Sequence, residues 1–437
     1  MSTTLQPTQN RITSIDALRG FALAGIIIAH MIEEFLGGVI PDGVETSMHS
    51  GVFDYIAEAF MQIFIRGKFY ALFSFLFGIS FFIMMDQAAK KGSDFRWRFI
   101  WRLLILLIIG LIHSAIYRGD ILTVYVMIGL ILPVFYNVPT KWVLAIGLIL
   151  ILGAGRYVYF FIMGGDGLFG ENFNSPNSSN ALIYWEYLTT GTWIQVAKDN
   201  LTNGLLNKFD FQFGVFGRGY QTLAFFLFGL LAGRFRIFEK IDQFQVSRKN
   251  DESKQEWIKN NRYPFKDYVF RVMYWSLGLT LVFLIATIAI FVNAPQPVEF
   301  NNLITITGLT AMDLMNGAMT ILFVTGFIII FNNRKNSALN ILAPYGRTAL
   351  TNYVFQSIIG TFIFYHYGFG YIGKMPVSIA FLISLIIIAA QIYVSKLWLQ
   401  YFYYGPLEWI WRCLTYFKVF PFVRRTQTKI QFEEIRS

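Results

Sequence analysis

Cysteine is nearly absent from this chain of 437 residues, where Cys413 is the single example. One thiol excludes an internal disulfide and a cage of thiolate ligands around a metal ion. Charged residues are also scarce, at 14% of the sequence, whereas a typical soluble domain carries about 25%. The chain lacks an HExxH pair, a glycine-rich phosphate loop and clustered Cys and His ligands, so no metal site is predicted. These absences argue against a soluble, disulfide-rich or metal-binding class.

Long apolar runs are abundant instead. Hydrophobic residues make up 55% of the chain and aromatic residues 18%, and many runs reach the roughly 17–25 residues that a helix needs to cross a bilayer. The sequence therefore predicts an all-α, polytopic helical membrane protein with about ten transmembrane helices. The predicted spans are residues 17–36, 69–86, 101–118, 120–137, 142–163, 219–237, 268–293, 303–331, 348–366 and 375–395.

The net charge of +10 is distributed unevenly between the predicted loops. Basic residues cluster at 86–102, 234–271, 334–347 and from 396 onward. The intervening loops are poor in Lys and Arg or acidic, at 33–54, 166–210 and 294–302. Because basic loops are retained on the cytoplasmic side of a membrane, this alternation predicts an even number of spans with both termini in the cytoplasm. The positive charge thus indicates membrane orientation, and no nucleic-acid partner is expected.

The domain organisation follows from these spans. We predict one transmembrane domain over residues 1–418 and a cytoplasmic tail over 419–437. Within the domain we expect an outer loop with a helical second half, a cytoplasmic linker and a C-terminal amphipathic helix, at 164–213, 238–267 and 405–418. Residues 51–68 mix charged and aromatic side chains and predict an interfacial or re-entrant helix.

Ionisable groups inside the predicted spans are the candidate functional residues, because they are costly in lipid and usually face a cavity or a partner. Arg19 and His30 are eleven residues apart on the first span, a step that ends about 20° around the helix and about 16 Å deeper. Arg102 and His113 repeat this spacing on the third span, and Asp120 follows His113 by seven residues. Both histidines are therefore predicted to lie at similar depth, in a shared polar cavity.

Two later spans contribute further polar residues. Asp313 and Asn316 are about one turn apart on the eighth span. Asn352 and Gln356 are also one turn apart on the ninth span, just inside Arg347. Each candidate has an ordinary structural alternative: the arginines anchor to lipid phosphates, the amides hydrogen-bond between helices, Asp120 caps the fourth span, and each histidine is structural.

Five motifs resemble one family of bacterial inner-membrane proteins. They are RITSIDALRGFALAGIIIAH, KFYALFSFLFGISFF, HSAIYRGDIL, GRTALTNYVFQSIIG and GPLEWIWRCLTYFK. Together they resemble the YeiB-like family, a domain of unknown function, over nearly the whole chain. The spacing of Arg19 and His30 is more distantly similar to a signature of the transmembrane acyltransferase superfamily. That resemblance implies transfer of an acyl group, often from acetyl-CoA, to an acceptor at the membrane.

Two functions from different classes are compatible with these residues. In an acyltransferase, His30 or His113 acts as the base, Asp120 or Asp313 orients an imidazole, and cytoplasmic arginines bind the phosphates of an acyl-CoA donor. The donor and substrate contacts would come from Arg19, Arg102, Arg347, Asn316, Asn352 and Gln356. In a transporter or lipid-handling protein, His113, Asp120 and Asp313 would couple protons or contact the substrate, and the outer loop would be the gate. A scaffold whose polar groups only join helices is the third alternative.

Overall fold

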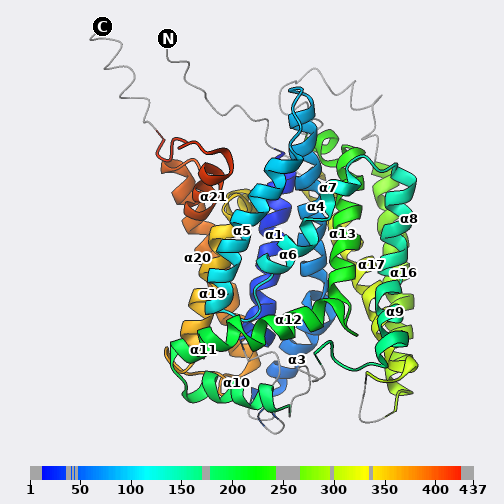
Figure 1. The fold of residues 1–437 in the computed structure, drawn as a ribbon, viewed down its shortest axis with the longest axis vertical. Helices are drawn as coiled ribbons and strands as arrows, with labels where there is room; N and C mark the ends of the chain where they lie inside the picture. The colour runs from blue at the N-terminus through cyan, green and yellow to red at the C-terminus, as the bar shows by residue number, and fades with distance from the viewer. Residues whose placement is uncertain are drawn as a thin grey trace.

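The computed structural model describes residues 12–35, 41, 44, 48–169, 178–242, 266–295, 300–333 and 338–424. That part of the chain is helical, as predicted, and its only β-pairing is an isolated bridge between Phe402 and Val423 (Figure 1). The helices are α1 (Thr13–Ala29), α3 (Val52–Phe60), α4 (Lys68–Ala89), α5 (Arg96–Ile116), α6 (Leu122–Gly129), α7 (Leu132–Phe135), α8 (Thr140–Ile151), α9 (Ala154–Met163), α10 (Ser179–Thr190), α11 (Trp193–Leu201), α12 (Asn203–Phe213), α13 (Arg218–Arg234), α16 (Lys266–Val292), α17 (Leu303–Asn333), α18 (Leu342–Arg347), α19 (Ala349–Phe364), α20 (Val377–Tyr401) and α21 (Pro406–Tyr416). Two π-helical turns follow α1 and α3, at His30–Glu34 and Met61–Ile65, and a short 3-10 helix, Ala338–Ile341, precedes α18.

Six helices of the described chain are long and apolar enough to cross a membrane, and two bent pairs raise the number to eight. The six are Thr13–Glu33, Val52–Ala89, Arg96–Ile116, Asp267–Val292, Leu303–Phe331 and Val377–Tyr401. The bent pairs are α8 with α9, at 49°, and α12 with α13, at 62°. The described residues therefore form a helical protein with six to eight helices that could cross a membrane, which does not confirm the ten predicted.

The difference arises where the predicted spans are broken or short. The predicted span 120–137 forms two helices, α6 and α7, and Pro133 in the first turn of α7 has no N–H to continue the α6 ladder. The predicted span 142–163 bends where Gly153 adopts a left-handed conformation, with φ of 85°. Of the predicted linker 238–267, residues 243–265 lie outside the described part, as does the tail from 425.

The bundle has two distinct ends. At the end that we call the terminal end, α1 begins and α21 lies (Figure 1). At the opposite end, the helical second half of the predicted outer loop forms α10, α11 and α12, which we call the capping helices. Their presence confirms the helix predicted in that half of the loop.

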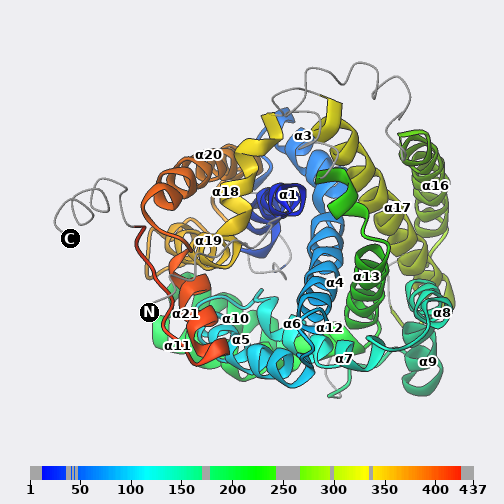
Figure 2. The same cartoon turned by 90° about the horizontal axis from the view of Figure 1, so that it is seen from above.

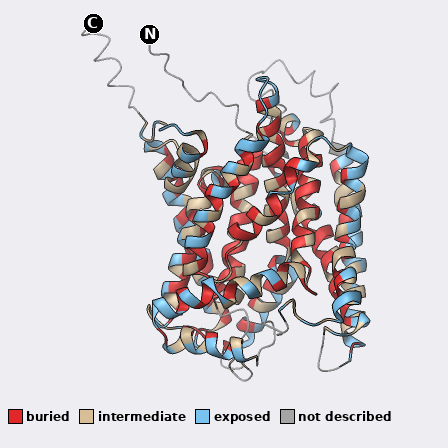
Figure 3. Cartoon of the chain, viewed as in Figure 1, coloured by how far each residue is buried: buried red, intermediate tan, exposed pale blue. Residues whose placement is uncertain are grey.

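Helix α1 forms the centre of the bundle, where α4, α18, α19 and α20 pack around it (Figure 2). In its most apolar stretch 78% of the residues are buried, whereas the corresponding fraction for α16 is 11%. Helix α16 packs on α17 at the edge of the bundle and exposes apolar side chains along most of its length (Figure 3). Both helices are apolar, with mean hydropathies of 1.7 for the central helix and 2.4 for the edge helix. Helix α16 has the surface expected of a helix that faces lipid.

Glycines allow the closest helix contacts in the bundle. Helices α4 and α13 meet at Gly78 and Gly229, where an added Cβ would lie 2.0 Å from a backbone oxygen of the partner helix. Small residues commonly permit this close approach between membrane helices.

Substituting Gly229 by alanine is expected to destabilise the protein by about 1–3 kcal/mol, because the new methyl group overlaps the backbone of Phe75. Thermal unfolding in detergent measures the effect. Gly278→Ala on α16 is the matched control, since nothing lies within 4 Å of its added Cβ. Equal melting temperatures for the two variants would contradict this account of the α4–α13 contact.

Glu408 attaches α21 to the start of α19. Its Oε1 accepts hydrogen bonds from the backbone N–H groups of Leu350, at 2.7 Å, and Thr351, at 3.1 Å. Its Oε2 accepts a third from the Thr351 hydroxyl, at 2.5 Å. These contacts satisfy free N–H groups in the first turn of α19, so a carboxyl group from one helix caps another.

Burial raises the pKa of Glu408 above its usual value. The protonated Glu408 side chain therefore stabilises the folded state fully below the ordinary carboxyl pKa. This stabilisation is lost as pH rises through the higher pKa of the folded state. We expect Glu408→Gln to match the wild type in mild acid and to melt progressively higher than the wild type as the pH is raised. Glu408→Ala should cost about 0.5–2 kcal/mol in mild acid, because it leaves the three donors without an acceptor. Melting curves across the pH range test both expectations, and a pH-independent difference between Glu408→Gln and wild type would refute the first.

Candidate functional site

A buried imidazole–carboxylate pair lies where α5 turns into α6. His113 is in the last turn of α5, and its Nδ1 is 2.7 Å from Oδ1 of Asp120. Both side chains are almost fully buried. Oδ2 of Asp120 also accepts hydrogen bonds from the Ser114 hydroxyl, at 3.1 Å, and from the N–H and hydroxyl of Thr123, at 2.9 and 2.7 Å. Asp120 therefore orients His113 and at the same time caps α6, which combines the functional and the structural alternatives.

Lys208 of α12 reaches into this pair from the capping helices. Its Nζ donates to the hydroxyls of Ser114 and Thr123, both at 3.1 Å, and lies 3.6 Å from Oδ2 of Asp120. The lysine compensates the buried carboxylate, which would otherwise be costly to keep ionised. Sequence reasoning missed Lys208 because it belongs to the predicted outer loop, and only the folding of α12 against α5 and α6 brings it here.

Arg118 fixes the capping helices over the same turn. It pairs with Asp199 of α11, and its guanidinium lies 3.4 Å from the ring centre of Tyr184 of α10. Asn200 of α11 also donates to the backbone oxygen of Ala115, at 3.3 Å. These contacts cover the His113–Asp120 pair from the end of the bundle opposite to α21.

His30 lies beside this pair, at the start of the π-helical turn that follows α1. Its ring centre is 5.1 Å from that of Tyr117 and 5.8 Å from that of Tyr353. The His113 ring contacts the same two tyrosines, at 6.0 and 5.0 Å. The structure thus brings His30 and His113 together around two aromatic rings, and π-helical turns of this kind are frequent at functional sites.

Each histidine has one buried ring nitrogen without a hydrogen-bond partner: Nε2 of His113 and Nδ1 of His30. Because Asp120 accepts from Nδ1–H of His113, the neutral ring presents a lone pair at Nε2. That assignment of the tautomer follows from the hydrogen bond and not from observed protons. Buried polar atoms usually have a hydrogen-bond partner, so the two ring nitrogens beside Tyr117 and Tyr353 make this the candidate functional site.

Asp313 belongs to a different cluster, on α9, α13 and α17. Its carboxylate accepts hydrogen bonds from Arg156 and Gln221, and Nη1 of Arg218 is 3.4 Å away. Neither histidine has a hydrogen bond to it. The expectation that Asp313 orients an imidazole is therefore corrected, since two guanidinium groups neutralise this carboxylate and Asp120 has that position at His113. Asn316 lies one turn further along α17.

Asn352 and Gln356 join three helices to one another. Asn352 donates to the hydroxyls of Thr348 and Ser395, at 2.8 and 2.9 Å. Gln356 donates to Tyr345, at 2.7 Å, and to Gln391, at 2.9 Å. These bonds link α18, α19 and α20, as expected of interhelical hydrogen-bonding residues, and they fix the helix that ends in Arg347.

The predicted donor-binding arginines lie toward the terminal end. Arg19 pairs with Asp16 at 2.8 Å and donates to Ser80 at 2.7 Å. The guanidinium of Arg102 lies 3.5 Å from the ring centre of Trp411 on α21. Arg347 is half-buried at the end of α18. Arg19 and Arg102 are thus each separated from the histidine of their own helix by eleven residues, or about 16 Å along the helix axis.

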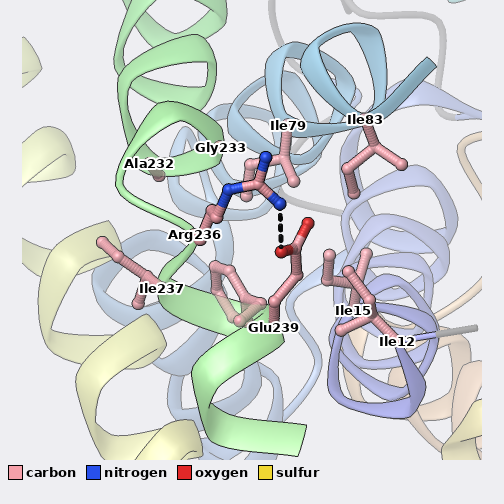
Figure 4. A pocket seen from close by; sticks show the side chains of 10 residues that line it. Ile12, Ile15, Ile79, Ile83, Ala232, Gly233, Arg236, Ile237 and Glu239 are labelled. Atoms are coloured by element: carbon pink, nitrogen blue, oxygen red, sulfur yellow. Dashed lines mark hydrogen bonds and ion pairs between the residues drawn. The ribbon is translucent and has the colours of Figure 1, made fainter. Parts of the chain in front are cut away.

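A shallow groove also lies at the terminal end (Figure 4). Aliphatic side chains dominate its lining, including Ile15 of α1 and Ile79 of α4, and a 2.8 Å ion pair between Arg236 and Glu239 borders it. Ile15 precedes His30 by fifteen residues, or about 22 Å along a helix. The groove contains none of the predicted site residues.

Fold and site together define a class: in the described residues, a helical protein whose long apolar helices could cross a membrane and enclose a buried histidine–carboxylate–lysine site. Residues 256–418 match a family described as "Protein of unknown function (DUF418)". The uncharacterized protein YxaH of Bacillus subtilis (strain 168) is 27% identical over 444 residues, covering 97% of this chain and 99% of YxaH. The uncharacterized protein YeiB of Escherichia coli (strain K12) is 42% identical over 86 residues, covering 20% of this chain and 22% of YeiB. These matches are consistent with the YeiB-like family of unknown function, which the sequence motifs resemble.

Proposed function

We propose that this protein is an acyltransferase of the bacterial inner membrane that moves an acyl group from a CoA-type thioester to a hydroxyl or amine acceptor. The observation that carries the proposal is the His113–Asp120 pair, in which the carboxylate holds Nδ1 and leaves a buried, unpartnered Nε2. This is the arrangement of a general base whose orientation is set by a third group.

The chemistry follows from that geometry. Nε2 of His113 takes the proton of the acceptor O–H or N–H while the acceptor attacks the thioester carbonyl. Asp120 stabilises the imidazolium that forms. The carbon–sulfur bond then breaks, and the imidazolium returns its proton to the departing CoA thiolate. The products are the acylated acceptor and free CoA. His30 packs against the same two tyrosines, and its Nδ1 would hydrogen-bond to the acceptor or to the thioester carbonyl.

The donor would bind from the terminal end, which we assign to the cytoplasm together with both termini. Support comes from the basic segments that flank α21 and from Arg19, Arg102 and Arg347, whose planar guanidinium groups suit phosphate. Asn352 and Gln356 act here as positioning residues, because their hydrogen bonds hold α18 and with it Arg347. The acyl group would then meet the histidines deeper in the bundle, under the capping helices.

The proposal is tested with purified protein and radiolabelled acyl-CoA. We expect the wild type to bind acyl-CoA and to release CoA slowly to water or to an added membrane acceptor. His113→Ala is expected to abolish CoA release and leave acyl-CoA binding intact, because the base is removed and the arginines remain. His366→Ala serves as the control, since His366 is exposed. Absence of acyl-CoA binding by the wild type, or full activity in His113→Ala, would refute acyl transfer.

A transport function is the second candidate, favoured by the two bent helix pairs. Helices interrupted at mid-membrane commonly form transporter sites. Arg218, the first residue of α13 after its bend with α12, forms an ion pair with Asp313. Uptake by proteoliposomes that is lost in Asp313→Asn but retained in His113→Ala would support this candidate over the first.

A further inference from the structure

One surface at the terminal end combines exposed aromatic side chains with arginines. It is formed by α21 and the first turns of α5, which pack against each other (Figure 1). The indole N–H of Trp411 donates to the backbone oxygen of Arg102 at 2.8 Å, and that of Trp101 donates to the backbone oxygen of Leu414 at 3.1 Å. We call it the α5–α21 surface, and its exposed members are Trp97, Arg98, Trp101, Leu414, Phe417 and Val419.

Arg98 and the half-buried Arg412 carry the positive charge of this surface. Both guanidinium groups lie 5.5 Å from the ring centre of Tyr416, and that of Arg412 is also 4.6 Å from the ring centre of Phe420. Within the described residues, neither guanidinium has a carboxylate oxygen within 4.0 Å or a hydrogen bond to a protein acceptor. An aromatic face attracts a cation without neutralising it, so both charges lack a counter-ion there.

The neighbouring charged residues do not supply one. Arg96, also in the first turn of α5, pairs with Asp94 at 2.7 Å. The only acidic residue of α21 is Glu408, which caps the start of α19. Moreover, Nε of Arg412 is a buried hydrogen-bond donor without a partner. Buried donors normally have an acceptor, so a free N–H beside two uncompensated cations indicates an anionic ligand.

The position of the surface in the fold places it at the edge of the membrane. Helix α5 is a candidate membrane-crossing helix of 21 residues, which corresponds to about 32 Å and matches the roughly 30 Å of a bilayer's hydrocarbon core. Arg98 lies in its first turn, at the level of lipid headgroups. Trp97 is 80% and Phe417 76% exposed beside it, and Trp in particular is enriched at that level.

We propose that the α5–α21 surface binds anionic phospholipids, with Arg98 and Arg412 holding the headgroup phosphate and the exposed aromatic side chains contacting the adjoining acyl chains. A guanidinium presents a planar fork of N–H donors that matches phosphate oxygens. Amphipathic helices with basic and aromatic residues attach to anionic bilayers through both charge and apolar contact. The site is open to the lipid around α5 and needs no separate entry. It does not depend on the proposed acyl transfer.

A reporter on the surface measures which lipid gathers there. Because the chain has one cysteine, Cys413→Ser with Val419→Cys leaves a single thiol for a fluorescent dye. Serine keeps an acceptor for the N–H of Phe420, which Sγ of Cys413 accepts at 3.4 Å. In proteoliposomes without acyl-CoA, the dye is quenched by phosphatidylglycerol or by phosphatidylcholine, each with the same nitroxide at the same acyl-chain position. Each labelled lipid is titrated into neutral lipid.

We expect half-maximal quenching at a several-fold lower mole fraction of labelled phosphatidylglycerol than of labelled phosphatidylcholine. The difference should shrink at high salt, because the attraction is electrostatic. Arg98→Gln and Arg412→Gln should each raise the mole fraction of phosphatidylglycerol required and leave the phosphatidylcholine curve unchanged, which also shows that the variant is folded and inserted. Lys374→Met, exposed at the end that carries the capping helices, should keep the full preference.

Four outcomes would overturn the inference. The first is equal curves for the two lipids with both arginines present, and the second is an undiminished preference in the double variant Arg98→Gln with Arg412→Gln. The third is a dye that neither lipid quenches, because another protein surface then covers the site. The fourth is loss of the preference on adding acyl-CoA at constant ionic strength, which would assign the arginines to the donor. Acyl-CoA release in detergent is measured separately, so the two proposals can fail independently.

Discussion

Asp313→Ala is expected to destabilise the protein by about 3–5 kcal/mol, because it leaves the buried Arg156 without its carboxylate. The guanidinium of Arg156 is 3% exposed and makes its other hydrogen bonds to Thr310 and to the backbone oxygens of Val215 and Phe216. Neutral oxygens do not replace a counter-ion in a medium of low dielectric constant, so the loss should be large. Unfolding in mixed micelles with increasing denaturing detergent measures it.

The double variant Asp313→Ala with Arg156→Met is the control for this prediction. It removes both charges, so much of the lost stability should return even though a cavity remains at position 313. Asp166→Ala, at an exposed position, should change little. If the double variant is no more stable than Asp313→Ala, the destabilisation comes from lost packing and not from the unpaired arginine.

Asp120→Asn is expected to slow acyl transfer by about 10²–10⁴-fold with little change in acyl-CoA binding, the range associated with a positioned general base. The amide no longer stabilises an imidazolium, and it can donate a hydrogen bond to Nδ1 of His113, which moves the ring proton to Nε2. Steady-state kinetics should show the loss in kcat and not in KM. This prediction rests on the proposed function.

Two controls separate catalysis from stability at this site. Lys208→Met removes the compensating charge of Asp120 without touching the His113 hydrogen bond. It should lower the melting temperature and preserve part of the activity. Asp120→Asn with wild-type kcat, in a protein that remains folded, would show that the pair has only the structural role of capping α6.

The candidate site was partly predictable because it combines local and long-range features. The repeated spacing of Arg19 with His30 and Arg102 with His113 is a property of single helices, so it indicated that the two histidines lie together. Asp120 was recognisable for the same reason, because it follows His113 by only seven residues. Lys208 and Tyr353 were not, because their contacts join segments far apart in the sequence.

Asp313 shows the limit of reasoning from residue type. A carboxylate inside an apolar run suggests a buried function, and Asp120 and Asp313 look alike in that respect. The three-dimensional packing of α9 and α13 against α17 places two arginines and a glutamine on Asp313, whereas a histidine and a lysine contact Asp120. Which partner a buried charge finds depends on neighbouring helices and not on its own helix.

The amino-acid sequence by itself determined the helical class and the presence of helices long and apolar enough to cross a membrane, because hydropathy and helix period are local properties of the chain. Only the tertiary structure decided that α1 is central while α16, which is also apolar, lies at the edge, since hydropathy does not say which surface meets protein and which meets lipid. It also decided the bends at α8–α9 and α12–α13 and the placement of the capping helices.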